Sequence, residues 1–345
     1  MEQKPTVIEL FAGAGGLALG LEKAGFKTIA LVENNRFASQ TLLKNRPNWN
    51  VINEDIEKVA QKGIRNYIDV VDIDLLSGGY PCQSFSYAGN RLGLADTRGT
   101  LFYYYAEILK ELQPKMFLAE NVKGLLSHDK GRTLKTMIEV FQDVGYRVQY
   151  KVLNAFDYGV AQKRERIFII GIRNDFFKGE FQFPKPLKKK LVLKDVLKNC
   201  PPSPCATYSE KKREILKLVP AGGYWKDLPE NIAKEYLGKS YYSNGGKTGV
   251  ARRLSWNEPS LTILCSPSQK QTERCHPDEV RPLSIRESAR IQSFPDSWEF
   301  VGSISEQYKQ IGNAVPVELA KHVGLAIKSY LKKRRHYGQL QLEFY

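Results

Sequence analysis

The chain has 345 residues, of which 42% are hydrophobic and 26% charged, as in a folded protein with room for two lobes. Lys and Arg number 52 against 37 Asp and Glu, and this net charge of +15 favours a polyanionic partner. No apolar run approaches the roughly 18 to 20 residues that span a bilayer, and the start of the chain lacks a signal-peptide pattern. We therefore expect a cytoplasmic protein without a membrane partner. The five scattered cysteines argue against a disulfide framework.

Short apolar runs alternate with amphipathic stretches from Thr6 to Gly171, as a parallel sheet covered by helices requires. This pattern predicts an α/β domain. The predicted strands are 7–10, 28–32, 73–76, 116–119, 149–153 and 167–170, and the predicted helices are 17–24, 101–112 and 132–144.

The composition of the chain changes after Arg173, where Pro and Gly become frequent among aromatic residues. Residues 176–280 contain 19 Lys and Arg against 11 Asp and Glu, so we expect a second, smaller lobe that contacts the polyanion. Helices are predicted again at 285–293 and 317–331. We divide the chain into four segments, which are 1–175, 176–280, 281–303 and 304–335.

A glycine-rich turn, Phe11–Gly16, follows the first predicted strand and opens a helix. This is the place where a backbone approaches a nucleotide-type cofactor, and Glu33 lies where an acid binds ribose hydroxyls. A dehydrogenase is a rival interpretation, and a glycine turn without a ligand is the plainer one. Asn34 and Asp55 extend the polar edge, although Asp55 is equally suited to cap a helix.

Cys82 follows the apolar strand that ends at Leu76, so it should stand on a loop at the same edge of the sheet. Glu120 ends the next strand, and Arg164 and Arg166 would share one face of an extended segment. A thiolate, a carboxylate and guanidinium groups together indicate nucleophilic catalysis. The plainer interpretations are a buried small cysteine and a solvated charged run.

Six motifs, taken in order, resemble those of DNA (cytosine-5)-methyltransferases. The resemblance implies a Rossmann-like, S-adenosylmethionine-dependent methyltransferase with a doubly wound sheet, of the bacterial restriction-modification type. Segment 1–175 would be the catalytic and cofactor-binding domain, 176–280 the target-recognition domain, 281–303 a hinge with a recognition-lobe helix, and 304–335 a return to the catalytic domain. The motifs are Phe11–Gly16, Pro81–Gln83, Glu120–Val122, Gln162–Arg166, Arg281–Pro295 and Gln310–Pro316.

The resemblance implies that S-adenosylmethionine is the cofactor. Glu33 would bind its ribose hydroxyls, Asp55 its adenine amino group and Ile56 the face of the adenine ring. Asn34 departs from the large side chain that relatives often have there. The expected cofactor residues are Phe11, Gly13, Gly15, Gly16, Glu33, Asn34, Asp55, Ile56, Pro81, Leu101 and Asn313.

The resemblance also implies a mechanism on a cytosine that has rotated out of the duplex. Cys82 would add to carbon 6, and Glu120 would hold ring N3 and the exocyclic amine. Arg164 and Arg166 would engage O2 and neighbouring groups. Asn121 would brace the cysteine loop, of which Gln83 is also a part.

Double-stranded DNA is the implied partner, contacted through Ser86, Arg98, Arg252, Arg253 and Thr262. We expect the two adjacent arginines to read guanine edges and Thr262 to lie near the DNA backbone. No metal is expected, because the cysteines lack paired ligand spacing. We further expect a monomer that works alongside a restriction endonuclease.

We weigh three other functions against this one. RNA cytosine methylation would use the same fold, and an idle nucleic-acid-binding module would lack the catalytic set. A dehydrogenase would give no reason for the Pro81-Cys82 loop. The residues do not identify the DNA sequence that is recognised.

Overall fold

The computed structural model describes residues 3–69, 72–81 and 100–342, with 333–342 as backbone only. Within these residues the chain forms two compact units. Unit 1 contains Met1–Asn154, Glu165–Pro186 and Val317–Tyr345, and unit 2 contains Ala155–Arg164 and Leu187–Pro316. No helix among the described residues is both long and apolar enough to cross a membrane.

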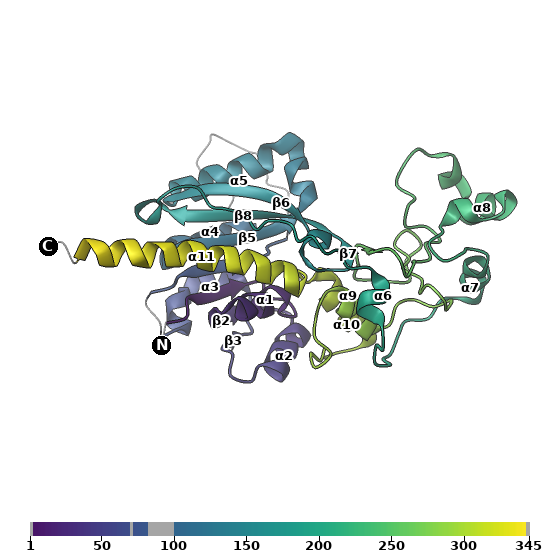
Figure 1. Ribbon diagram of the computed structural model, residues 1–345, viewed down its shortest axis with the longest axis horizontal. Helices are drawn as coiled ribbons and strands as arrows, with labels where there is room; N and C mark the ends of the chain where they lie inside the picture. Colours follow the sequence, from purple (N-terminus) through teal and green to yellow (C-terminus); the bar gives the residue numbers. More distant parts are fainter. Residues whose placement is uncertain (1–2, 70–71, 82–99, 343–345) are drawn as a thin grey trace. The chain divides into compact units, whose positions relative to one another are not determined.

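Unit 1 is built on a seven-stranded sheet with the order β3-β2-β1-β4-β5-β8-β6 (Figure 1). The strands β1 to β5 are parallel, whereas β8 runs antiparallel to both of its neighbours. The six predicted strands are confirmed with small shifts at their ends. The sheet also contains the short strand β3, and the bounds of its seven strands are β1 Thr6–Leu10, β2 Lys27–Val32, β3 Val51–Ile52, β4 Leu75–Gly78, β5 Met116–Val122, β6 Tyr146–Asn154 and β8 Glu165–Arg173.

Helices cover both faces of this sheet, which confirms the doubly wound α/β class. Along β1, Ile8 and Leu10 join the core with residues of α3, α4 and α5. The side chains between them point to the opposite face, because strand residues alternate, and there Glu9 is hydrogen-bonded to the backbone of Ala18 in α1. The helices of unit 1 are α1 Gly16–Ala24, α2 Arg36–Asn45, α3 Ile56–Lys62, α4 Leu101–Leu112, α5 Arg132–Asp143 and α11 Val317–Leu342.

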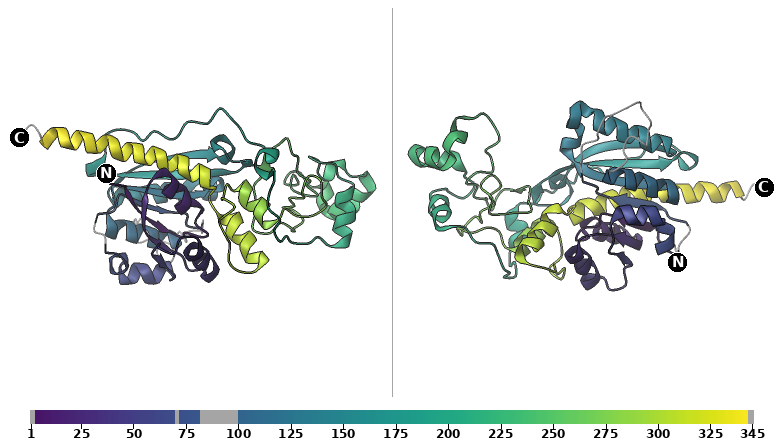
Figure 2. Two further views of the ribbon diagram at one scale, coloured as in Figure 1. Left: turned by 60° about the horizontal axis from the view of Figure 1, so that its bottom comes forward. Right: turned by 180° about the vertical axis from the view of Figure 1, so that it is seen from behind.

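The helices α1 and α11 lie side by side although they come from opposite ends of the chain (Figures 1 and 2). Two glycines allow this close approach. A Cβ on Gly20 would lie 2.4 Å from the Cβ of Ala320, and a Cβ on Gly324 would lie 2.8 Å from the Cβ of Ala24. The last helix of the chain is thereby packed against its first helix, which follows the glycine-rich turn.

Unit 2 has little regular structure, as the loss of the strand and helix alternation predicts. Its own core includes Tyr208, Leu216, Val219 and Cys275. The parallel pair β7–β9 joins residues 162–163 to 260–261. Its elements are α6 Leu193–Leu197, α7 Glu210–Lys217, α8 Glu230–Leu237, α9 Ile285–Ile291, α10 Ile304–Asn313, β7 Gln162–Lys163 and β9 Ser260–Leu261.

The compact units divide the chain at other residues than the four expected segments. Residues 155–164 and 304–316 belong to unit 2 and not to unit 1, whereas residues 176–186 belong to unit 1. The pairing of β7 with β9 explains the first difference. The second follows from Gln292, whose Nε2 donates to the carbonyls of Ile311 and Ala314.

Replacing Gly20 by Ala should lower the free energy of unfolding by about 1 to 3 kcal/mol, because the new methyl overpacks the α1–α11 contact. Denaturant unfolding of the purified protein measures this change. Gly124→Ala is the matched control, since its Cβ would meet only the Val122 side chain at 3.9 Å. Equal losses in the two variants would contradict the packing argument.

Candidate active site

The glycine turn leaves the carboxyl end of β1 in a left-handed conformation. Phe11, Gly13 and Gly15 have φ angles of 58°, 54° and 84°. The helix α1 starts directly afterwards, and its N-cap Gly15 provides no side-chain cap to the first turn. A helix N-terminus without a side-chain cap, beside a Gly13 backbone with open space around it, suits an anionic or polar ligand group. The expected cofactor loop therefore has suitable local geometry.

The carboxylate of Glu33 braces this turn. Its Oε2 accepts a hydrogen bond from the Gly13 N–H at 2.7 Å, and its Oε1 accepts one from the Asn35 N–H at 2.7 Å. The Glu33 side chain is buried, whereas the neighbouring Asn34 is exposed. Glu33 thus links the loop after β1 to the start of α2.

The remaining expected cofactor residues of unit 1 lie at the same edge of the sheet. Asp55 is the N-cap of α3, and its Oδ1 accepts a hydrogen bond from the Glu57 N–H at 2.8 Å. The capping interpretation of Asp55 is therefore present in the structure. Ile56 is buried in the core, Leu101 is half-buried at the start of α4, and Pro81 is exposed.

An ion pair joins the ends of β5 and β8. Arg166 Nε lies 3.1 Å from Glu120 Oε1, and the two side chains are 14% and 11% exposed. Burial lowers the pKa of Arg166, and the charge of Glu120 opposes that shift. A Cβ on Gly79 would lie only 3.0 Å from Glu120 Oε2, so glycine lets the chain after β4 pass beside the carboxylate.

Asn121 holds the chain just before the cysteine loop. Its Nδ2 donates to the Tyr80 carbonyl at 2.9 Å, and its Oδ1 accepts from the Val122 N–H at 2.8 Å. Tyr80 is itself buried in the aromatic core between α4 and α5. Four predicted residues, Cys82, Gln83, Ser86 and Arg98, lie outside the described residues.

The structure places Arg164 in unit 2, where its side chain is almost fully buried. Its Nη1 donates to the Ile263 carbonyl at 3.1 Å, and its Nη2 donates to the Gly312 carbonyl at 2.9 Å. The neighbouring Asn313 accepts a hydrogen bond from the thiol of Cys265 at 3.0 Å. Arg164 thus connects two backbone segments of unit 2, which the sequence pattern alone did not indicate.

Two buried glutamines complete this connection, and the sequence analysis assigned no role to either. Gln162 accepts from the Ile263 N–H at 2.9 Å and donates to Gln292 at 2.9 Å. Thr262, beside them, donates to the Lys163 carbonyl at 2.9 Å. Both glutamines lie inside motifs quoted from the sequence, and their place in those motifs was the available signal.

The two arginines expected to read DNA differ in their surroundings. Arg253 donates to three backbone carbonyls, those of Val219, Pro277 and Asp278, at 2.8 to 3.2 Å. Arg253 therefore holds loops of unit 2 together. Arg252 lies 3.6 Å from Glu258. Within the described residues, its guanidinium forms no comparable set of hydrogen bonds to backbone carbonyls.

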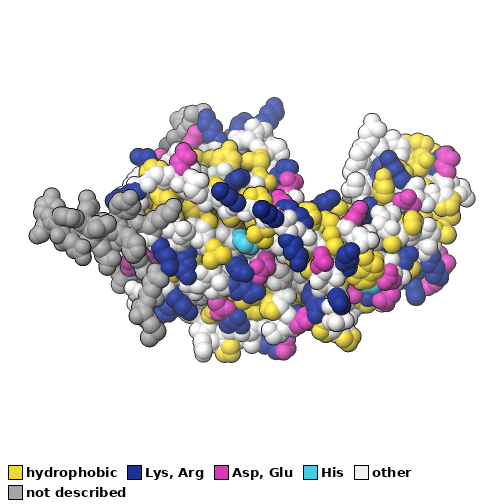
Figure 3. Space-filling model, viewed as in Figure 1, with side chains coloured by type: hydrophobic (Ala, Val, Ile, Leu, Met, Phe, Trp, Pro, Cys, Tyr) yellow, Lys and Arg dark blue, Asp and Glu magenta, His cyan; other side chains and the backbone are white. Residues whose placement is uncertain are grey.

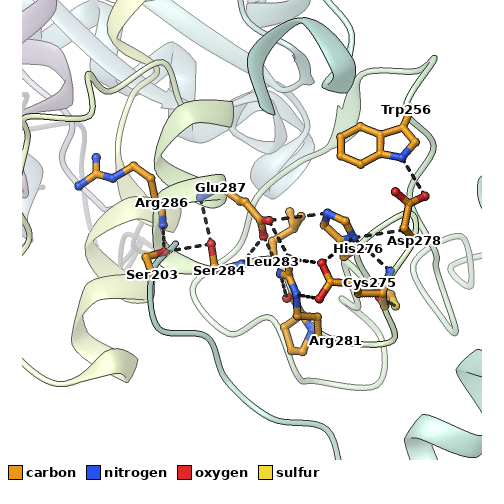
Figure 4. Close-up of polar contacts among 12 residues, drawn as sticks. Ser203, Trp256, Cys275, His276, Asp278, Arg281, Leu283, Ser284, Arg286 and Glu287 are labelled. Atoms are coloured by element: carbon orange, nitrogen blue, oxygen red, sulfur yellow. Dashed lines mark hydrogen bonds and ion pairs between the residues drawn. The ribbon is translucent and has the colours of Figure 1, made fainter. Parts of the chain in front are cut away.

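A polar cluster at the start of α9 supports these loops (Figure 4). Arg281 forms two hydrogen bonds with Glu287 at 2.8 and 2.9 Å, and Glu287 also accepts from the Ser284 N–H at 2.7 Å. The ring of His276 packs edge-on against Trp256, with centroids 5.3 Å apart, and its Nδ1 accepts from two backbone N–H groups. Burial lowers the pKa of His276.

Glu287 should make unit 2 sensitive to acid. Burial alone would raise its pKa, but the hydrogen bonds from Arg281 and Ser284 outweigh burial, so the pKa lies below the ordinary 4.5. Its stabilisation is therefore present above pH 4.5 and is lost as the pH falls through the lowered value.

The difference in unfolding free energy between wild type and Glu287→Gln should shrink as the pH falls below 4.5. Denaturant titrations at several pH values, followed by tryptophan fluorescence, measure it. Glu235→Gln serves as the control because that side chain is 72% exposed. A difference that stays constant with pH would rule out this role for Glu287.

Comparisons with known proteins agree with this arrangement. A family model for C-5 cytosine-specific DNA methylases matches residues 5–329. The chain is 61% identical to Type II methyltransferase M.Sau96I of Staphylococcus aureus over 95% of this chain and 76% of that protein. It is 55% identical to Type II methyltransferase M.Eco47II of Escherichia coli over 95% of this chain and 80% of that protein. The fold is similar to that of the S. pombe Dnmt2 methyltransferase, with a TM-score of 0.62 over 95% of this chain and 99% of that one, at 17% identity.

Proposed function

The chain belongs to the C-5 cytosine-specific DNA methylase family and is a DNA (cytosine-5)-methyltransferase of the Type II restriction-modification kind, and from that premise we propose its mechanism. We propose that it transfers a methyl group from S-adenosylmethionine to carbon 5 of a flipped-out cytosine in one specific duplex sequence, through a covalent bond to Cys82. The observation that carries the proposal is the Glu120–Arg166 ion pair. This pair lies beside Gly79, and Gly79 precedes Cys82 by a few residues along the chain.

The residues at the edge of the sheet fit S-adenosylmethionine. The left-handed turn at Gly13 has open space where a Cβ would stand, so a ligand can approach the backbone there. The carboxylate of Glu33 is held by two N–H groups and is suited to accept hydrogen bonds from ribose hydroxyls. The bound cofactor would supply an electrophilic methyl group. Asp55, Ile56, Leu101 and Asn313 are further proposed contacts.

Cys82 supplies the nucleophile in this mechanism. Its thiolate forms a bond to carbon 6 of the cytosine, and the electron pair of the carbon 5 to carbon 6 double bond makes carbon 5 nucleophilic. With S-adenosylmethionine bound, carbon 5 would take the methyl group, and the cofactor sulfur would keep the electron pair of the methyl–sulfur bond as that bond breaks. A base removes the proton from carbon 5, the double bond returns, and the carbon–sulfur bond breaks to release the thiolate. The target must leave the base stack first, at a cost of a few kcal/mol.

Glu120 and Arg166 stabilise the ring during this step. A carboxyl group at N3 compensates the charge that develops when sulfur adds to carbon 6. Arg166 holds Glu120 in place at 3.1 Å and offers its remaining donors to O2 of the base. Arg164 is proposed to act indirectly, because its donors hold the Ile263 and Gly312 carbonyls. Asn121 fixes Tyr80 at the start of the loop.

The biological role proposed here is the protection of host DNA from a partner restriction endonuclease. The two relatives support it, because both are named Type II methyltransferases. We propose that the enzyme acts as a monomer. Ser86 and Arg98 are retained as proposed DNA contacts.

Duplexes with 5-fluorocytosine at the target position should trap a denaturation-resistant adduct that requires S-adenosylmethionine. Fluorine cannot leave carbon 5 as a cation, so the bond to Cys82 cannot break. Cys82→Ser should form no adduct, because an alcohol is a far poorer nucleophile at neutral pH. Denaturing gel electrophoresis and peptide mass spectrometry identify the attached residue. Attachment at another residue would contradict the role of Cys82.

Glu33→Ala should weaken S-adenosylmethionine binding by about tenfold or more, because a charged hydrogen-bond acceptor is lost. Calorimetry with the cofactor measures the affinity, and a separate titration with duplex DNA should change little. Glu22→Ala is the control in the same unit, since Glu22 is paired with Arg46 at 33% exposure. A normal cofactor affinity in Glu33→Ala would exclude Glu33 from the pocket.

A further inference from the structure

Lys247 closes a loop in unit 2 that runs from Ser240 to Lys247, here called the 240–247 loop. Its ammonium donates to the carbonyls of Ser240 at 2.8 Å, Tyr241 at 3.0 Å and Ser243 at 2.5 Å. An ammonium group has three donors, so these three carbonyls use all of them. Lys247 is therefore a clamp inside the loop and not a free surface cation.

Aromatic contacts and backbone bonds hold the clamped loop to the rest of unit 2. Lys247 Nζ lies 5.0 Å from the centre of the Trp225 ring, and Trp225 packs edge-on against Tyr241 at 5.8 Å. The Trp225 N–H donates to the Val250 carbonyl at 3.1 Å, directly after the loop. Trp225 thus contacts both the 240–247 loop and Val250, which follows it.

The outward face of the 240–247 loop carries Tyr242 and Asn244. Tyr242 is 77% exposed, the highest value among the exposed large hydrophobic side chains of the described residues. Asn244 is exposed as well, and it precedes Gly245 and Gly246, which have φ angles of 78° and 74° and open space around them. A loop that exposes an aromatic ring and an amide is suited to a partner with flat apolar surfaces and hydrogen-bonding edges.

The surrounding charge favours duplex DNA as that partner. Between Tyr224 and Arg253 the chain has six Lys and Arg against three Asp and Glu. Lys226 and Lys239, which both precede the 240–247 loop in sequence, are exposed. Over the face shown in Figure 3, Lys and Arg side chains are mixed with acidic ones and do not form one continuous patch. This distribution of charge agrees better with base recognition by one loop than with phosphate binding by a broad basic surface alone.

We propose that Lys247 is a positioning residue that holds the 240–247 loop in shape so that Tyr242 and Asn244 contact base edges in duplex DNA. Asn244 supplies a side-chain amide that can bond bidentately to a base edge, and Tyr242 supplies an apolar surface. The inference rests on the proposed function, because it takes sequence-specific duplex DNA as the substrate. It replaces Arg253 as a base-reading residue, since the Arg253 guanidinium donates to backbone carbonyls.

The test uses the full enzyme and the DNA sequence that it methylates, mapped by sequencing of modified cytosines. Methyl incorporation is measured on a duplex with that sequence and on duplexes with each base pair changed in turn. The ratio of kcat/KM between the two kinds of duplex gives the discrimination. Lys247→Met removes the donors at nearly constant length, and it should reduce discrimination roughly tenfold, through KM more than kcat.

Two further variants separate the roles of the outward side chains. Tyr242→Ala should weaken binding to the mapped duplex roughly tenfold, whereas Tyr242→Phe should keep most of it. Asn244→Ala should relax the choice at one base pair only. These variants keep the proposal testable if Lys247→Met fails to fold, which thermal unfolding reveals.

Lys239→Met is the matched control, because Lys239 is exposed in the same segment. It should weaken binding equally on all sequences and reduce the slope of log affinity against log salt by about 1. The same change of slope in Lys247→Met, with unchanged discrimination, would overturn the proposal and make Lys247 a phosphate contact. Normal DNA affinity in Tyr242→Ala would also overturn it. The partner of the loop would then be a protein and not DNA. A wild type without methyl incorporation would contradict the proposed function itself.

Discussion

The ion pair between Arg166 and Glu120 is the interaction on which the catalytic edge of the sheet depends. The antiparallel register of β5 and β8 sets Val122 opposite Arg166, so the two charged side chains emerge together where these strands end. Both are largely buried, and removing one partner would leave an uncompensated charge, which is strongly destabilising. Gly79 in turn lets the chain that leaves β4 pass beside the same carboxylate. The geometry of one strand pair therefore positions the proposed acid and its partner.

A second constraint acts at the other end of the same edge. The Glu33 carboxylate accepts a hydrogen bond from the backbone of Gly13, which has a left-handed φ angle that side chains disfavour. The acid that is proposed to bind ribose thus also holds the turn that approaches the cofactor. On this proposal one residue serves both the local fold and the ligand, so its loss should affect both. The control at Glu22 distinguishes an altered site from a merely altered charge.

Much of the fold could be predicted from the sequence, because apolar runs of strand length alternate with amphipathic helices in unit 1. Periodicity does not encode the order of strands, so the insertion of β8 between β5 and β6 became visible only in the structure. The same limit applies to the arginines. The sequence analysis predicted Arg164, Arg166 and Arg253 alike to contact the substrate, but only the fold shows that Arg166 forms an ion pair with a carboxylate while the other two donate to carbonyls of distant segments. Chemical type was predictable from the residues, and the partner of each guanidinium was not.

The position of the methyl group in the product tests the central claim most directly. The purified chain should be incubated with S-adenosylmethionine and duplex DNA that contains its mapped sequence, and the nucleosides should then be analysed by mass spectrometry against authentic standards. Addition of sulfur to carbon 6 activates carbon 5, so the account predicts 5-methylcytosine. N4-methylcytosine or N6-methyladenine as the product would contradict it, because neither requires a thiolate, the Glu120–Arg166 pair or a covalent intermediate.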